Sequence, residues 1–258
     1  MRFKQKPGEI LKRLGIYEPE DIDLDLVAYS LNAEVKRAAL SGSEGNIIGT
    51  DEKAIITINH DADQRRQRFS LGHELGHWVN DRGKNLTYRC DANDMRQRSL
   101  SKHNFRQQKE VRANQFSAEL LMPNHIWHRY LKNLDVTTRS VKYLACEFNV
   151  SRTSAAIRFV ETCEYPCMIV CWDSSGSRRW FSRNAIVPDS IWPHARIVHP
   201  HEAFAHSNSN EVDADKWVSG EGAEDYSVIE SVFSNDYEIL SLIWWKNEDQ
   251  IIDAEFLN

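Results

Sequence analysis

Cysteine is scarce in this sequence, and its pattern argues against two kinds of cross-linked protein. The 258 residues contain five cysteines, an odd number, and no two of them form a CxxC pair. A disulfide framework and a zinc site built from cysteine pairs are therefore not indicated. Cys163, Cys167 and Cys171 are spaced by four, so Cys167 and Cys171 would share one face of a strand. We interpret the cysteines as free thiols of a cytoplasmic protein.

Long apolar runs are also missing. The longest, such as ILSLIWW at 239–245, are far too short to span a bilayer. The first ten residues, MRFKQKPGEI, lack the apolar core of a secretory signal. No internal repeat or low-complexity segment is present. We therefore expect a cytoplasmic globular protein with no membrane partner.

Excess positive charge is absent overall, but the charge is unevenly distributed. The net charge of −6 argues against a protein that coats nucleic acid through bulk electrostatics. Between Arg82 and Arg112 there are nine basic residues and three acids, whereas from Glu202 onward there are fourteen acids and two lysines. This asymmetry indicates two regions with different surfaces.

The first part of the chain mixes helix and strand patterns. Residues 22–32 have the apolar spacing of a helix, and residues 33–40 alternate like a strand. After a turn cluster at 41–46, residues 47–59 are typical of one or two further strands. The elements expected next are a helix capped by Asp61 or Asp63 and ending near Asn80, a long loop at 81–104, a helix at 109–122, and a helix from Pro123 to about Lys132.

The remaining chain changes character twice. Residues 141–161 predict a helix, a turn and a second helix, with Asn149 in the turn, where asparagine tolerates a left-handed backbone. Short apolar runs separated by polar turns follow, which indicates a β-rich region. We divide the chain into a core (1–135), a helix-turn-helix-like segment (136–163) and a C-terminal β-rich α+β domain (164–258) for recognition or control.

The segment RFSLGHELGHWVND at 68–81 contains two histidines four residues apart. On a helix each residue advances about 100°, so His77 lies about 40° from His73 and both imidazoles share one face. This is the spacing with which a helix supplies two zinc ligands, and Glu74 lies beside them as a base. Gly72 and Gly76 lie close to the histidine face, where they allow another segment to approach.

A third ligand is expected from the helix at 109–122, which offers two glutamates. Glu110 and Glu119 are nine residues apart, about 180° on one helix, so only one can face the metal. Glu119 shares its side with Arg112 and Gln115, as on a solvent face. Glu110 shares its side with small or apolar residues suited to close packing, namely Ala113, Asn114, Ser117 and Leu121. We therefore predict Glu110 as the ligand, with Asn114 accepting the N–H of a ligand histidine.

Two separated segments together resemble the ImmA/IrrE metallopeptidase family. HELGH at 73–77 is followed by EVRANQFSAELLMP at 110–123, and the family signature joins HExxH to E-x-x-A-N-x-F-A-x-E-L-L-M-P. Ser117 stands where alanine is usual. The preceding AIITIN and RRQRFSL are also similar, and the resemblance covers roughly residues 20–160.

The resemblance implies an α+β, zincin-like metallopeptidase core. It implies Zn²⁺ bound by His73, His77 and Glu110, with Glu74 as the catalytic base. It also implies a partner: family members cleave or inactivate helix-turn-helix repressors, so we expect limited proteolysis of such a repressor or of an antitoxin. Side chains that could contact substrate or the transition state are Tyr88, His103, His125 and His128.

Two other functions remain open from the sequence. A DNA-binding regulator would read DNA with residues 141–161, but this segment is only mildly basic, so direct DNA binding is not favoured. Its zinc would be structural and would need a fourth protein ligand, from Cys90 or His103. A non-proteolytic zinc sensor would instead use the loop at 81–104 as a switch. If the protein is a peptidase, we expect water in the fourth position of the zinc ion, and neither Cys90 nor His103.

Overall fold

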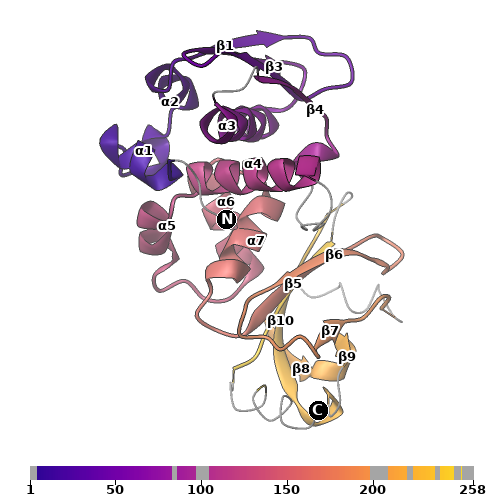
Figure 1. Ribbon diagram of the computed structural model, residues 1–258. Helices are drawn as coiled ribbons and strands as arrows, with labels where there is room; N and C mark the ends of the chain where they lie inside the picture. The colour runs from indigo at the N-terminus through magenta and orange to yellow at the C-terminus, as the bar shows by residue number, and fades with distance from the viewer. Residues whose placement is uncertain are drawn as a thin grey trace. The chain divides into compact units, whose positions relative to one another are not determined.

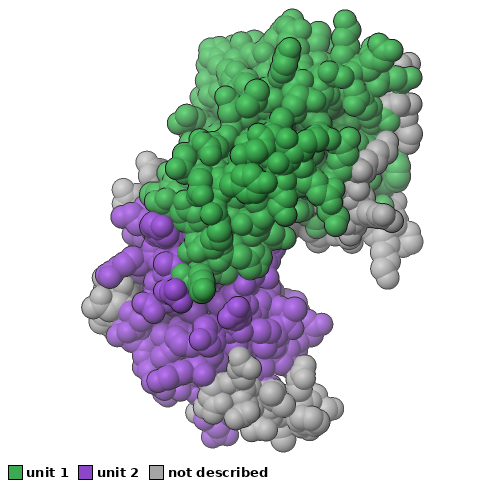
Figure 2. All heavy atoms as spheres, turned by 90° about the vertical axis from the view of Figure 1, so that its left-hand side faces the viewer, with its two compact units in different colours: residues 1–132, 146–151 green, residues 133–145, 152–258 purple. Residues whose placement is uncertain are grey.

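The structure is a computed structural model, which describes residues 5–82, 86–96, 105–197, 209–219, 223–235, 239–246 and 251. The fold is of the mixed α+β class, as expected. It divides into two compact units (Figure 2): unit 1 comprises Met1–Lys132 with Cys146–Ser151, and unit 2 comprises Asn133–Ala145 with Arg152–Asn258. None of the helices in the described ranges has the length and apolar character needed to cross a bilayer.

Unit 1 contains a four-stranded mixed sheet in the order β1-β3-β2-β4. Its strands are β1 (Ala33–Ala38), β2 (Gly45–Gly49), β3 (Ala54–Asn59) and β4 (Leu86–Cys90). β1 runs parallel to β3, whereas β2 is antiparallel to both β3 and β4. The first three strands agree with the apolar patterns of the sequence, while β4 lies within the segment predicted to be a loop.

Short helices precede the sheet. They are α1 (Pro7–Arg13), the 3₁₀ turn η1 (Pro19–Asp21) and α2 (Leu24–Ser30). Asp23 caps α2, because its carboxylate accepts the backbone N–H groups of Asp25 and Leu26. α2 buries Leu24, Val27 and Ala28, which are the apolar residues that gave residues 22–32 their helical period.

Helix α3 (Gln64–Asp81) lies between the sheet and a second long helix, α4 (Phe105–Leu121), as Figure 1 shows. Asp63 caps α3 by accepting the N–H of Arg66, which confirms one of the two expected caps. Because the helix is covered on both sides, every residue from Ser70 to Asp81 is buried.

The sheet face of α3 packs closely on β2. A Cβ added to Gly49 would lie 2.9 Å from the ring of Trp78, so glycine leaves the space that the indole occupies. The Trp78 indole N–H also donates a hydrogen bond of 2.8 Å to the carbonyl of Leu31. Leu71, Leu75 and Trp78 are all buried.

Two sequence predictions for the region after α3 need correction. The segment predicted as one loop contains β4 and the 3₁₀ turn η2 (Asp94–Arg96), because strand pairing with β2 orders a sequence that has no clear period of its own. Helix α4 also begins at Phe105 and not at residue 109. Helix α5 (Asn124–Leu131) begins directly after Pro123, as expected.

The expected helix pair at 141–161 is present as α6 (Thr138–Glu147) and α7 (Arg152–Thr162). Asn149, between the two helices, has the left-handed backbone predicted for the turn, with φ 47°. The structure groups α7 with unit 2, where it contacts β5 and β6. Thr138, at the start of α6, hydrogen-bonds through its N–H and hydroxyl to the Ser231 hydroxyl of the same unit.

The sheet of unit 2 is antiparallel, with the order β6-β5-β11-β10-β8. Its strands are β5 (Cys167–Trp172), β6 (Arg178–Arg183), β8 (Asn210–Asp213), β10 (Ser227–Ser234) and β11 (Ile239–Trp244). A separate two-stranded sheet joins β7 (Trp192–Pro193) to β9 (Val218–Ser219), and two 3₁₀ turns are η3 (Ala214–Lys216) and η4 (Ala223–Asp225). Every residue of β5 is buried, which explains its continuous apolar run.

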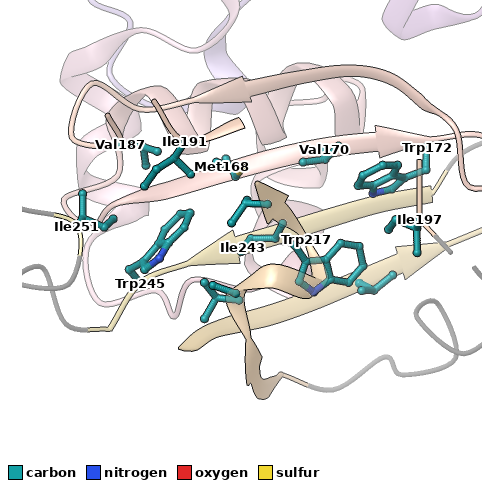
Figure 3. Close-up of a cluster of buried hydrophobic side chains, with 14 of the residues drawn as sticks. Met168, Val170, Trp172, Val187, Ile191, Ile197, Trp217, Ile243, Trp245 and Ile251 are labelled. Carbon is teal, nitrogen blue, oxygen red and sulfur yellow. The ribbon is translucent and has the colours of Figure 1, made fainter. Parts of the chain in front are cut away.

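One face of this sheet carries the core of unit 2. Trp172, Trp217 and Trp245 lie among Met168, Val170 and Ile243, together with other apolar side chains (Figure 3). Close to this core is a buried carboxylate, Glu230, which accepts hydrogen bonds from the Trp217 indole at 2.6 Å and from the Lys216 ammonium at 2.8 Å. These three tryptophans therefore contribute to a core within unit 2.

Cys167 and Cys171 lie on the opposite side of β5 from Met168 and Val170, because side chains alternate along a strand. Cys167 Sγ lies 4.0 Å from the carbonyl oxygen of Val160 in α7. Within the described ranges, these cysteines and Cys163 belong to no group that could hold a metal ion. All five cysteines are free thiols.

Candidate metal centre

Helix α3 presents His73 and His77 on adjacent turns. Their ring Nε2 atoms lie 3.0 Å apart, and the side chains are 0% and 1% exposed. Two imidazole nitrogens at this distance, without water, can share at most one proton. The two facing lone pairs therefore need either that proton or a metal ion between them.

Helix α4 brings the Glu110 carboxylate to the same point. Its Oε2 lies 3.2 Å from the Nε2 of His73 and 3.2 Å from the Nε2 of His77. The close approach of the helices depends on small residues: a Cβ at Gly72 would lie 2.5 Å from the Ser117 hydroxyl, and one at Gly76 would lie 2.9 Å from Ala113 Cα. The face of α4 assigned to close packing is therefore the face against α3.

The three donor atoms fit a metal ion. Nitrogen or oxygen ligands about 2.0–2.1 Å from a tetrahedral zinc ion are separated from one another by about 3.3–3.4 Å. The observed separations of 3.0, 3.2 and 3.2 Å lie close to this value. The second carboxylate oxygen of Glu110 is buried and has no hydrogen-bond partner among the described residues. A cation at this point could bind the donor atoms of all three side chains. Hydrogen bonds among the three side chains leave the second oxygen of Glu110 without a partner.

Asn114 sets the orientation of His73. Its side-chain oxygen lies 2.8 Å from His73 Nδ1, and its amide donates to the carbonyl of Asp94 at 3.0 Å. The second contact fixes which end of the amide faces the ring, so Nδ1 carries the proton and Nε2 keeps its lone pair. This is the placement that the sequence analysis expected for Asn114.

Asp81 lies on the corresponding side of His77, at ion-pair distance and beyond hydrogen-bond distance, and it was not predicted from the sequence. Its Oδ2 lies 3.6 Å from His77 Nδ1, and its Oδ1 accepts a hydrogen bond of 2.9 Å from Arg112. The Lys109 ammonium lies 3.9 Å from the same carboxylate. The signal was available, because Asp81 follows His77 by four residues on the same helix.

The electrostatics of the cluster reflect charge held without water. Burial alone would lower the pKa of His77, but the Asp81 and Glu110 carboxylates outweigh it and raise this pKa to about 9. Burial would raise the pKa of Glu110, but the two histidines lower it to about 2. For His73 burial dominates and lowers the pKa. Without a metal ion, His77 and Glu110 therefore form the charged pair of the cluster.

Glu74 is fully buried beside the cluster, and neither of its carboxylate oxygens has a hydrogen-bond partner among the residues described. Burial raises the pKa of Glu74 to about 7. Gly45 of β2 makes room for this side chain, since a Cβ there would lie 2.6 Å from Glu74 Oε1. A buried carboxyl group of this kind is poised to take up and release a proton near neutral pH.

Cys90 is the fourth residue of the cluster. It ends β4 opposite Gly45, and its Sγ lies 3.6 Å from His77 Nε2 and 3.8 Å from Glu110 Oε2. The donor atoms of His73, His77, Cys90 and Glu110 all lie within 4.8 Å of one another. Burial raises the pKa of the thiol, and the neighbouring carboxylates raise it further. For a peptidase we expected water as the fourth ligand of the metal, whereas the structure places the Cys90 thiol next to the other three donor atoms.

Tyr88 also reaches the cluster, where its ring lies against that of His77. The two rings are stacked, with centroids 4.4 Å apart and an interplanar angle of 10°. The Tyr88 hydroxyl accepts a hydrogen bond from the Lys109 ammonium. Of the candidate substrate contacts, Tyr88 is the one that the structure brings to the site.

Two other candidates, His125 and His128, lie elsewhere. His125 in α5 contacts the carbonyl of Ile16 at 3.2 Å and the ring of Tyr17, and His128 lies 2.9 Å from the Asn124 carbonyl of its own helix. Glu119 is partly exposed, whereas Glu110 is 1% exposed. His103 lies outside the described residues.

The second helix of the helix-turn-helix-like pair is largely covered. Along α7 only Glu161 is exposed, and Ala155, Ala156, Phe159 and Val160 are buried. Arg152 stacks on the ring of Phe233, 3.9 Å from the ring centroid, within unit 2. A helix that reads DNA must present its side chains to the groove, whereas α7 uses one face, with its four buried residues, for packing in unit 2.

These features define a class: a helix pair that gathers two histidines and a glutamate around one point, with a second buried glutamate beside it, has the architecture of a metallopeptidase domain. Comparison with protein families gives the same class, because residues 29–160 match the IrrE N-terminal-like domain, Peptidase_M78. The match spans half of the chain and includes the whole cluster. The protein belongs to this peptidase family.

Two further comparisons bear on the fold. A comparison with curated proteins gives no match. Among solved structures, a Mycobacterium tuberculosis transcriptional regulator is similar, with a TM-score of 0.56 at 15% sequence identity over 93% of this chain and 74% of that chain. At this identity the likeness concerns the fold alone.

Proposed function

We propose that the protein is a zinc-dependent endopeptidase. The observation that carries the proposal is the pairing of the His73, His77 and Glu110 donor atoms with the buried, unpartnered carboxylate of Glu74. A site with a structural role alone has no use for a second carboxylate held without hydrogen bonds, which burial disfavours.

The donor set supports zinc as the metal. Two imidazole nitrogens and one carboxylate oxygen are the ligand types of many catalytic zinc sites, whereas magnesium and calcium prefer oxygen ligands alone. Asn114 and Asp81 would hold the imidazole rings with their Nε2 lone pairs directed at the ion. When bound, zinc would polarise the scissile carbonyl and lower the pKa of water at the site.

The chain's own contribution to the chemistry centres on Glu74. Its carboxylate would take a proton from the attacking water and then deliver that proton to the leaving amine nitrogen. Burial keeps solvent from competing for this proton. Gly45 lets the carboxylate lie against β2, so the base is held in place by packing.

Strand β4 offers a means of binding an extended peptide. It is the terminal strand in the sheet order β1-β3-β2-β4 and pairs with β2 along one side. An extended substrate that paired with its other side would pass close to Tyr88 and Cys90 of the same strand, next to the cluster. Backbone pairing of this kind accepts many sequences, so further specificity would come from elsewhere in the chain.

The proposed substrate is a helix-turn-helix repressor or antitoxin in the cytoplasm. The resemblance noted in the sequence supports this class, as does the acidic character of residues 202–258, which would attract the basic face of a DNA-binding protein. Five free thiols fit a reducing compartment. Unit 2, with its own core, would supply recognition or control.

Substitution of Glu74 tests the proposal. Glu74→Gln keeps the shape of the side chain but cannot accept a proton, so cleavage should fall by at least ~10²-fold while zinc content is retained. The assay combines metal analysis with cleavage of a small repressor encoded by the neighbouring gene, and of a peptide library profiled by mass spectrometry. Glu119→Gln, the same change at a partly exposed position, is the matched control and should behave as wild type.

The outcomes separate the parts of the proposal. Wild-type cleavage by Glu74→Gln would remove this residue from the mechanism. Cleavage of the library but not of the repressor would keep the peptidase and discard the substrate class. Wild-type protein that binds no zinc at all would discard the metal centre itself.

A second candidate function is a metal-holding sensor that controls a partner by contact without cutting it. The position of Cys90 favours it, because a fourth protein ligand closes the site to water. In that case Glu74→Gln would leave control of the partner unchanged, and no cleavage product would appear with the wild-type protein. A role in reading DNA has no comparable support, since Glu161 is the one exposed residue of α7.

A further inference from the structure

Cys90 differs from the other buried cysteines in its surroundings. Its thiol is buried next to two imidazoles and two carboxylates, whereas Cys171 lies in an entirely buried apolar strand. As a thiol, Cys90 can donate one weak hydrogen bond, to Glu110, whereas a thiolate bound to a cation would interact with the whole cluster. The question is what this thiol does at the centre of the cluster.

The distances from the Cys90 sulfur to the other donor atoms indicate its role. A sulfur ligand about 2.3 Å from zinc and a nitrogen or oxygen ligand about 2.0–2.1 Å from it, in tetrahedral geometry, lie about 3.5–3.6 Å apart. Cys90 Sγ lies 3.6 Å from His77 Nε2 and 3.8 Å from Glu110 Oε2. The other three donor atoms are spaced as zinc ligands, and the sulfur lies at about ligand spacing from two of them and within 4.8 Å of all three, so it can serve as a fourth ligand.

Backbone pairing places the thiol there. Cys90 is the cross-strand partner of Gly45, so both positions face the same side of the sheet, towards α3. Gly45 has no side chain, which leaves room for Glu74, while Cys90 extends to the ligands. The register of β4 on β2 therefore brings the sulfur and the base to the same cavity from adjacent positions.

We propose that Cys90 supplies the fourth metal ligand and closes the resting site, so that cleavage requires Cys90 to leave. The inference rests on the proposed function, because it concerns the metal of that site. In the closed state Glu74 faces a sulfur ligand and has no water to activate. Departure of the thiol opens one position to water and places it next to the base. Because β4 ends the sheet and pairs only with β2 among the described strands, its displacement breaks one ladder.

Cobalt substitution tests the ligand directly, without relying on activity. The full-length protein, freed of metal and loaded with one equivalent of Co²⁺, should show the intense near-ultraviolet charge-transfer band of a thiolate–cobalt bond. Cys90→Ser and Cys90→Ala should lose this band while still binding Co²⁺ through the other three ligands. Cys171→Ala, another buried cysteine, and Cys146→Ala, an exposed one, are the controls and should keep the band.

Cleavage provides the second readout. With zinc bound, Cys90→Ala should cut the peptide library faster than wild type, because water occupies the fourth position permanently. If neither Cys90 variant folds, the wild-type and Cys171→Ala spectra still decide whether a thiolate binds the metal. Wild-type protein that binds cobalt without the band overturns the proposal. A peptidase that depends on Glu74 could still stand in that case, whereas absence of any bound metal would remove both proposals.

Discussion

The contact between α3 and α4 can be tested by adding a single methyl group. In Gly76→Ala the new Cβ would lie 2.9 Å from the Cα of Ala113 and 3.1 Å from its carbonyl oxygen. Both atoms belong to the backbone, so no side-chain rotation can relieve the overlap. The two helices must therefore move apart, and this strains the packing on both sides of α3.

Two opposing terms set the magnitude. Alanine in place of glycine inside a helix gains about 1 kcal/mol. Overpacking of a close contact costs about 1–3 kcal/mol, and a backbone neighbour favours the upper end. The net loss is then about 2 kcal/mol, which corresponds to a melting temperature about 4–8 °C lower for a domain of 150–250 residues. Helix separation should also weaken metal binding, because His77 follows Gly76 on α3 while Glu110 lies on α4.

Thermal melting of the metal-free protein and zinc competition with a chelator measure the two effects. Gly8→Ala is the matched control, since Gly8 is also helical but an added Cβ would meet only His125 Nδ1, at an ordinary 3.6 Å. This control should melt at or above the wild-type temperature, because alanine in place of a helical glycine adds up to about 1 kcal/mol to the free energy of unfolding. If the Gly76→Ala variant also melts above the wild-type temperature and binds zinc as tightly as wild type, the close contact between Gly76 and the backbone of Ala113 is refuted.

Three further predictions concern single contacts. Glu110→Ala should abolish stoichiometric zinc binding, whereas Glu119→Ala should retain it; equal loss in both would contradict the assignment of the ligand. Asn114→Ala should lower zinc affinity about 10–100-fold without abolishing binding, as chelator competition would show, because the ring of His73 loses its orienting partner. In unit 2, Glu230→Ala should reduce stability by about 1–3 kcal/mol in denaturant titration, because the Trp217 indole N–H and the Lys216 ammonium both lose the buried carboxylate that accepts their hydrogen bonds; an unchanged unfolding midpoint would contradict a stabilising role for this carboxylate.

The sequence predicted the helices of the site well because helical phase carries geometric information. The i, i+4 spacing of His73 and His77 and the nine-residue separation of Glu110 and Glu119 each determine a relative direction on a regular helix. The structure accordingly buries Glu110 against both histidines and leaves Glu119 partly exposed.

The strand that carries Cys90 could not be predicted in the same way. Residues 81–104 have no clear period, and the ordering of β4 comes from its pairing with β2, some forty residues earlier in the chain. Pairing register is a long-range property that local sequence specifies weakly. The proximity of Cys90 to His77 therefore follows from the sheet and not from any motif.

The limits of the units were equally hard to infer. Residues 136–163 have a local helix-turn-helix pattern, which suggested a separate segment. The described structure instead groups most of this pair with the C-terminal sheet, where α7 covers β5 and β6. A truncation after residue 163 would therefore remove the sheet on which α7 packs, and would test stability before it tested recognition.

Burial of the cluster has a consequence for how this chain can change over time. The covered half of α3 contains His73, Glu74, His77, Asn80 and Asp81, all polar and all buried. Such residues oppose folding unless something compensates them, and apolar replacements of similar volume are often neutral or stabilising. Stability and function thus make conflicting demands on one helix. A descendant freed from its function would gain stability by filling these positions with apolar side chains, so the polar interior of α3 is the place where loss of function would first become visible.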